Sequence, residues 1–277
     1  MKFSAYTLSL PTLTPIEGAR LVSSCGLAGV EWRVAADPAE FRNESPSFTR
    51  NNLCTIAMTV DGGRQGGEHA SRYRLDVVGL APYIDVGDVA AFVRAAQTAK
   101  ACGTRNIRVR APELDGRSFD DLFRFGRRFL EDAVQVAKDF EVKAVLEMHQ
   151  RTLCPSASLA ERMVNGLDPR YLGVIYDVGN MVLEGYEDPR IGLGLLGEYL
   201  CHVHLKNAAW YRAESGAWGW RWAPLDSGMV DVPAFLRCLS DHEYQGWVSL
   251  EDLSSELPPD ETLRYNVGLL RDWGYLA

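Results

Sequence analysis

The sequence lacks the features that identify secreted, membrane-bound or nucleic-acid-binding proteins. No stretch of apolar residues reaches the length of about 18 that a membrane-spanning helix needs. The first residues are too short and too polar a run to form a signal peptide. The formal net charge is −8, whereas binding to nucleic acid or to an acidic membrane needs a basic surface. We therefore expect no nucleic-acid partner and no membrane partner.

The sequence also lacks a disulfide framework. Its six cysteines are scattered along the chain, and no two of them form a C-x-x-C pair. This spacing is typical of reduced thiols in a cytoplasmic protein. We therefore predict a cytoplasmic location.

What the sequence does contain is a regular alternation of short apolar runs and amphipathic segments. Apolar runs at residues 3–8, 29–34, 75–81 and 106–110 precede segments with helix-start and helix-stop residues, such as Asp88 and Gly103. Four more apolar runs follow in the C-terminal half. Eight strands alternating with about eight helices predict an α/β fold, a (β/α)8 TIM barrel in a single domain over residues 1–277. An open, doubly wound sheet is the alternative.

Residues 35–73 are the least regular part of the chain, with two prolines and two Gly-Gly pairs. We predict a long loop here, with at most a short helix near residues 68–74. A loop of this length in a compact domain usually has a function.

The four apolar runs of the C-terminal half each end in residues that bind divalent metals. They read AVLEMH, VIYDVGN, CHVHLKN and VSLED, and they supply Glu147, Asp177, His204 and Glu251. Parallel barrel strands present their carboxyl ends at one rim, so these four side chains are expected to converge. Three carboxylates and one imidazole suit one Mn²⁺, Mg²⁺ or Co²⁺ ion, with Zn²⁺ as an alternative. Ordinary ion pairs at strand ends are the competing interpretation.

Side-chain alternation along the strands adds four candidates at the same rim. Residues two apart share a face of a strand, which adds His149, Lys206, Arg108 and Arg110. We expect His149 and Lys206 to bind substrate hydroxyls or an oxyanion, and the two arginines to bind a substrate carboxylate or phosphate. Structural ion pairs are the alternative for the lysine and the arginines.

Three polar residues inside the predicted strands are weaker candidates. His202 lies one pleat deeper than His204, and we interpret it as a packed core histidine. Glu31 and Arg33 end the second predicted strand, where they could line the same rim.

Four of the seven tryptophans lie close together after the seventh predicted strand: Trp210, Trp218, Trp220 and Trp222. The alternation of the last three predicts a hairpin with one aromatic face. Because this segment follows a ligand-bearing strand directly, it overhangs the predicted site. Trp210 and its neighbours are therefore expected to contact a sugar ring, close a lid, or pack against a second subunit of a homo-oligomer. Simple core packing is the alternative.

Residues 192–197 match the dinucleotide fingerprint G-x-G-x-x-G. That fingerprint must follow a strand and open a helix. Here it precedes the seventh predicted strand, and no strand leads into it. We interpret it as a small-residue helix face and expect neither a nicotinamide nor a flavin cofactor.

The chain resembles the sugar isomerase/epimerase superfamily with the xylose-isomerase-like barrel. This superfamily includes ketose 3-epimerases, hydroxypyruvate isomerases and inosose dehydratases. The likeness extends over nearly the whole chain. It rests on Leu146-Glu147, Tyr176-Asp177-x-Gly179-Asn180, Val203-His204-Leu205-Lys206-Asn207, Ser249-Leu250-Glu251, and the segment 222–228 with Asp231.

The resemblance implies roles for several of these residues. Glu147, Asp177, His204 and Glu251 match the family's metal ligands, and the two glutamates also match its proton carriers. Asn180 stands where ketose 3-epimerases have a substrate-binding histidine, so substrate binding is expected there. The family's endonuclease branch uses many more histidines than the five present here, so DNA repair is not expected.

The expected reaction is isomerisation or epimerisation of a sugar, keto-sugar or related polyol. Glu147 and Glu251 would move protons next to a carbonyl through a metal-stabilised enediolate. A lyase that uses the same site, either inosose-dehydratase-like or keto-glycoside-cleaving, is the second hypothesis. A non-catalytic binding subunit is the third.

Overall fold

Eight parallel strands close into a barrel in the computed structural model, which describes residues 1–35, 41 and 43–277. Around the barrel the order is β1-β11-β8-β7-β6-β5-β4-β2, and pairing of β1 with β2 completes the circle. This confirms the predicted (β/α)8 fold. The strands are β1 (Lys2–Tyr6), β2 (Gly29–Val34), β4 (Asp76–Pro82), β5 (Asn106–Val109), β6 (Lys143–Glu147), β7 (Leu172–Asp177), β8 (Leu200–Leu205) and β11 (Trp247–Leu250).

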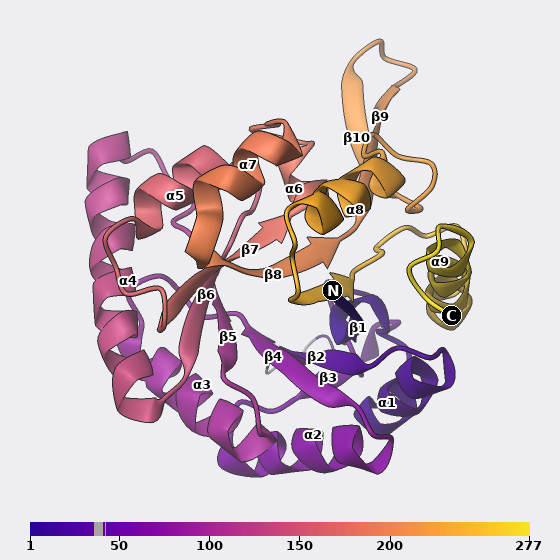
Figure 1. The fold of residues 1–277 in the computed structure, drawn as a ribbon, viewed down its shortest axis with the longest axis horizontal. Coiled ribbons are helices and arrows are strands. Elements are labelled where there is room, and N and C mark those ends of the chain that lie inside the picture. Colours follow the sequence, from indigo (N-terminus) through magenta and orange to yellow (C-terminus); the bar gives the residue numbers. More distant parts are fainter. Residues whose placement is uncertain (36–40, 42) are drawn as a thin grey trace.

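Helices form a ring outside the strands (Figure 1). Their starts follow the sequence, because Asp88, Ser118 and Asp231 each accept a hydrogen bond from a backbone N–H of the first turn. Gly103 ends its helix in the left-handed conformation, as predicted. The ring contains α1 (Pro15–Ser24), α2 (Val60–Arg72), α3 (Val89–Cys102), α4 (Phe119–Phe140), α5 (Ala157–Val164), α7 (Pro189–Leu196), α8 (Val232–Asp241) and α9 (Pro259–Asp272).

The prediction for residues 35–73 is wrong in one respect. Much of the expected loop is structured, with the short strand β3 (Thr55–Ile56) beside β2 and the 13-residue helix α2. The glycines that suggested a loop instead let α2 approach its neighbours, because a β-carbon at Gly63 would lie 2.3 Å from the Thr98 carbonyl oxygen of α3. Within the predicted loop, residues 36–40 and 42 lie outside the described residues.

A two-stranded antiparallel hairpin follows β8 and projects beyond the barrel (Figure 1). It consists of β9 (Asn207–Arg212) and β10 (Trp218–Ala223), so the predicted hairpin is present. In the described part of the chain, no helix is long and apolar enough to cross a membrane.

Candidate metal centre

The four predicted ligand residues lie together inside the C-terminal mouth of the barrel. Glu147 and Asp177 are the last residues of β6 and β7, His204 lies in β8, and Glu251 directly follows β11. Each offers one ligand atom, and these atoms all lie within 4.8 Å of one another. All four side chains are buried. The barrel therefore gathers three carboxylates and one imidazole around one point.

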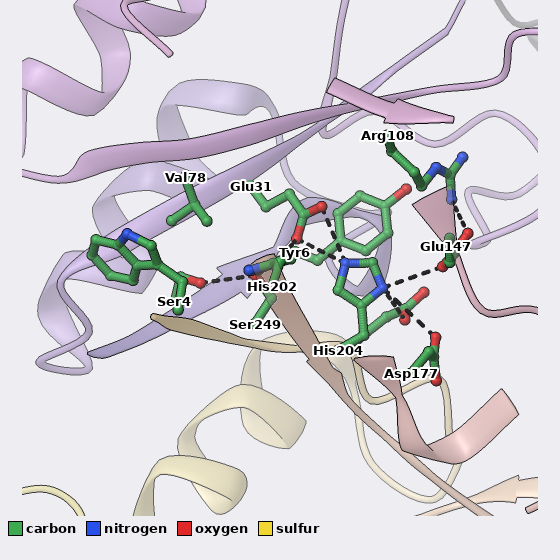
Figure 2. Close-up of polar contacts among 12 residues, drawn as sticks. Ser4, Tyr6, Glu31, Val78, Arg108, Glu147, Asp177, His202, His204 and Ser249 are labelled. Carbon is green, nitrogen blue, oxygen red and sulfur yellow. Dashed lines mark hydrogen bonds and ion pairs between the residues drawn. The ribbon is translucent and has the colours of Figure 1, made fainter. Parts of the chain in front are cut away.

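The imidazole of His204 faces the three carboxylates with its Nδ1 atom (Figure 2). This atom lies 3.2 Å from Glu147 Oε1, 3.3 Å from Glu251 Oε2 and 3.6 Å from Asp177 Oδ2. Among the described residues, His204 Nδ1 has no hydrogen-bond partner with suitable geometry. A buried nitrogen without a partner, surrounded by oxygen ligands, fits a divalent cation.

Two buried cations balance part of the negative charge of these carboxylates. Arg108 Nη1 lies 3.1 Å from Glu147 Oε2, and Lys206 Nζ lies 2.8 Å from Asp177 Oδ2 and 2.7 Å from Glu251 Oε2. Burial raises the pKa of Glu147, but the Arg108 guanidinium outweighs burial and holds this pKa well below its usual range. Burial lowers the pKa of Lys206, but Asp177 and Glu251 raise it above its usual value. Glu147 is therefore ionised and Lys206 is protonated at neutral pH.

His204 carries a proton in the metal-free protein. Burial lowers its pKa, but the carboxylates of Glu31 and Glu251 outweigh burial and raise it well above 6.5. A metal ion at Nδ1 would take the place of one proton.

A second polar layer lies below the ligands, and here sequence reasoning missed a role. Glu31 Oε2 of β2 lies 3.0 Å from His204 Nε2 and 2.9 Å from His202 Nε2. Ser249 Oγ is 3.0 Å from the same His202 nitrogen and 2.8 Å from Ser4 Oγ. Figure 2 shows Glu31 between the two histidines. The available signal was an acidic residue inside the otherwise apolar run 29–32, because such a carboxylate needs a buried partner.

A cavity of about 810 Å³ opens above the ligands. Its wall includes Glu147 and Glu251 of the ligand set. Four of the predicted substrate-binding residues also line it: His149, Lys206, Arg108 and Arg110.

The structure places the other two predicted substrate-binding residues elsewhere. Asn180 is fully buried, and its side-chain amide donates to Asp177 Oδ2 at 2.7 Å and to the Met148 carbonyl at 3.1 Å. It therefore orients a ligand residue instead of lining the cavity. Trp210 is 41% exposed on the hairpin, and the cavity wall contains Trp220 and Trp222 in its place.

Two small-residue positions of the sequence motifs explain the tight fit around the centre. A β-carbon at Gly179 would lie 2.3 Å from Lys206 Cγ and 2.8 Å from the Lys206 carbonyl oxygen. Gly228 likewise contacts Asn207, whose amide binds the carbonyls of Leu225 and Val230. These glycines let the short helix α6 (Val178–Met181), which follows β7, and the loop before α8 close against the residues that follow β8.

Comparisons with known proteins agree with this architecture. The inosose dehydratase of Bacillus velezensis is 25% identical over 127 residues, and the match spans 42% of this chain and 42% of that relative's length. Among solved structures, the 3-keto-D-glucoside 4-epimerase of E. coli shares the fold with a TM-score of 0.72 at 20% identity, over 98% of this chain and 99% of that one. The IOLI protein, solved with a zinc atom, has a TM-score of 0.75 at 14% identity, over 99% and 98% of the two chains.

The family assignment rests on a longer sequence match than the inosose dehydratase provides. The sequence model described as the xylose isomerase-like TIM barrel matches residues 19–273. The closed barrel and the position of the ligand cluster at its C-terminal mouth fit this match. The chain belongs to the xylose isomerase-like TIM barrel family.

Proposed function

We propose that this protein is a divalent-metal-dependent isomerase or epimerase of a sugar, keto-sugar or related polyol. One observation carries the proposal. The buried carboxylates of Glu147 and Glu251 each lie within 3.3 Å of His204 Nδ1, and both line the cavity. Two carboxylates that share a cation site and face a substrate cavity suit proton transfer next to a carbonyl.

The residues that would hold the metal are Glu147, Asp177, His204 and Glu251. When bound, a divalent ion supplies positive charge that polarises carbonyl and hydroxyl oxygens and stabilises negative charge developing on them, by several kcal/mol. The oxygen-rich set suits Mn²⁺, Mg²⁺ or Co²⁺, with Zn²⁺ as the alternative. The zinc atom in the IOLI structure supports an ion in a barrel of this fold.

The protein's own groups then position and move protons. Strands β6 and β11 are separated by β7 and β8 in the barrel, so Glu147 and Glu251 approach a substrate from different sides. Arg108 keeps Glu147 ionised and ready to accept a proton. Lys206 holds Glu251 from the other side. General acid–base groups of this kind each contribute about 10²–10⁴-fold to a rate.

A lyase is the second candidate, supported by the partial likeness to inosose dehydratase. The same base would remove the same proton, and the electron pair would then expel a β-hydroxyl or a glycosidic oxygen instead of being reprotonated. The two reactions therefore need the same carboxylates and differ in the fate of the intermediate.

The test is incubation of the metal-loaded protein with a panel of keto-sugars in D₂O, followed by NMR and mass spectrometry. Solvent deuterium at the α-carbon of a retained sugar supports the isomerase. Loss of water or of an aglycone supports the lyase. The variants Glu147→Gln and Glu251→Gln should lose exchange, whereas Glu131→Gln on the exposed side of α4 should keep it. Absence of exchange and of elimination across the whole panel would contradict both enzyme hypotheses.

A further inference from the structure

The cavity above the ligand cluster has a different charge from the rest of the molecule. Five cationic side chains line it against three carboxylates, although the chain carries a net charge of −8. A bound divalent ion would add further positive charge. Such a cavity attracts anionic ligands even though the protein as a whole is acidic. The five cations are Arg33, Arg108, Arg110, Arg151 and Lys206.

The deepest two cations form ion pairs with carboxylates of the ligand cluster. One of them also has a hydrogen-bond donor without a partner among the described residues. Lys206 lies between Asp177 and Glu251. Arg108 donates from Nη1 to Glu147 and from Nη2 to the Pro82 carbonyl. Its Nε is buried and has no hydrogen-bond partner among the described residues. An acceptor from a ligand in the cavity would satisfy this donor, because buried unpaired donors are costly.

Two further arginines stand at the rim, on neighbouring loops. Arg110 pairs with Glu113, whose side chain is 61% exposed. Exposed pairs of this kind contribute little, so a substrate anion can replace Glu113. Arg151 lines the cavity from the loop after β6, and a bridge between Glu113 and Thr152 joins the two loops.

The backbone of Arg151 is held in an uncommon conformation. Its φ is +62°, in the left-handed region that residues other than glycine seldom adopt. The backbone N–H of Arg151 donates a hydrogen bond to the Glu184 carboxylate, and the carbonyl of Arg151 accepts one from the Leu114 N–H. Strained positions fixed by their surroundings in this way cluster at ligand sites.

The part of the cavity wall that the hairpin supplies has a different character. Trp220 and Trp222 line the cavity there, with ring centroids 5.0 Å apart. Aromatic faces of this kind pack against the apolar face of a sugar. The cavity therefore combines aromatic rings from the hairpin, cationic side chains from the barrel and its rim, and the ligand cluster at its floor.

From this combination we infer that the substrate is an acidic sugar or polyol, whose carboxylate or phosphate binds to Arg110 and Arg151. The inference rests on the function proposed above, because it names the substrate class of the same cavity. Carboxylate and phosphate share the chemistry that arginine recognises, which is a pair of anionic oxygens accepting charge-assisted hydrogen bonds.

The test compares ligands that differ in one group. D-Glucitol is the neutral probe, D-gluconate carries a carboxylate at one end, and D-glucitol 6-phosphate carries a phosphate. Binding to the metal-loaded protein is measured by titration calorimetry at low and high salt. At least one acidic probe should bind about tenfold or more tightly than D-glucitol, and added salt should reduce that preference. The tighter of the two acids identifies the carboxylate or the phosphate as the recognised group.

Arginine variants separate this site from direct binding of the anion to the metal. Arg110→Gln and Arg151→Gln should each weaken binding of the acidic probe about tenfold, because each removes one charge-assisted hydrogen bond. The affinity for D-glucitol should not change. The control is Arg170→Gln, which removes an exposed arginine that pairs with Asp168 outside the cavity. Equal affinity for neutral and acidic probes would overturn the inference, as would an acid preference that survives both rim variants.

The deuterium-exchange experiment distinguishes failure of this inference from failure of the proposed function. Metal-dependent exchange on neutral keto-sugars, without any preference for acidic ligands, would support the proposed function and contradict the anion site. The converse result is a preference for acidic ligands that both rim variants abolish, without exchange on any neutral or acidic keto-sugar. It would support the anion site and contradict the proposed reaction.

Discussion

Glu31 and His204 are joined by a buried contact in which both carboxylate oxygens lie 3.0–3.1 Å from the imidazole Nε2. A carboxylate only accepts hydrogen bonds, so Nε2 carries the proton and donates it. Nδ1 is then the ring atom left for the ligand cluster. An outer carboxylate of this kind fixes the tautomer and orientation of a metal-binding histidine and raises its basicity.

Replacement of Glu31 by Gln should weaken metal binding about 10–100-fold, the usual effect of losing such a partner. The glutamine amide can still accept a hydrogen bond from His204 Nε2, but it carries no negative charge. His202 loses the same charged partner. Affinity is measured by competition with a chelator, with circular dichroism as the check of folding. The exposed change Glu131→Gln is the control. Wild-type affinity in the Glu31→Gln protein would show that the contact does not support a metal site.

The double change Glu147→Gln, Asp177→Asn should leave the purified protein without bound metal. It removes two charged ligands from a cluster of three carboxylates and one histidine, and neutral amides are weaker ligands for divalent ions. Metal content is measured by elemental analysis beside the Glu131→Gln control. A folded double variant that retains its full metal content would refute the assignment.

Metal affinity should depend on pH through His204. Its pKa in the folded, metal-free protein lies well above the ordinary value of 6.5. Because the pKa is higher in the folded than in the unfolded protein, protonation of His204 stabilises the fold fully below about pH 6.5. This stabilisation is lost as the pH rises through the pKa of the folded protein. Over that same range the metal displaces one proton, so affinity should rise about tenfold per pH unit.

Two measurements check this pH dependence. Calorimetry in buffers of different ionisation enthalpy should detect close to one released proton, and the melting temperature of the metal-free protein should fall above pH 6.5. The exposed change His242→Gln should leave both results unaltered. Metal affinity that is constant from pH 6.5 upward would contradict the proton on His204.

The Trp220→Ala variant should raise the KM of a sugar substrate about 2–10-fold, the value of one aromatic contact. Trp220 lines the cavity, whereas Trp218 of the same strand is 69% exposed. Trp218→Ala is therefore the matched control and should leave KM unchanged. Steady-state kinetics on both variants gives the result, and equal effects would argue against sugar contact by the hairpin base.

The Gly179→Ala variant should lose about 1–3 kcal/mol of unfolding free energy, because its β-carbon would overlap Lys206. Gly268 in α9 offers a contrast, since nothing lies within 4 Å of a β-carbon placed there. Gly268→Ala should therefore stabilise the protein by about 0.5–1 kcal/mol. Urea unfolding measures both changes, and similar values for the two variants would contradict the close contact at Gly179.

Local signals in the sequence were sufficient for most of the barrel. The apolar run 29–34 and the capping Asp88 act within a few residues of themselves, so the strand and the helix they predict are both present. Most of helix α2 was missed for the opposite reason. Its glycines disfavour a helix locally, and close packing against Ala57 and α3 stabilises it in the folded chain.

The four strand ends also illustrate what a sequence can decide. Once the parallel barrel is accepted, Glu147, Asp177, His204 and Glu251 must face one mouth, because strand polarity and side-chain alternation are local properties. Tertiary structure alone decided which atoms meet. It brought Glu31 to His204 across 173 positions of sequence, turned Asn180 onto Asp177, and placed Trp220 instead of Trp210 at the cavity. Those contacts depend on how the barrel closes and how the hairpin twists, which no short stretch of sequence encodes.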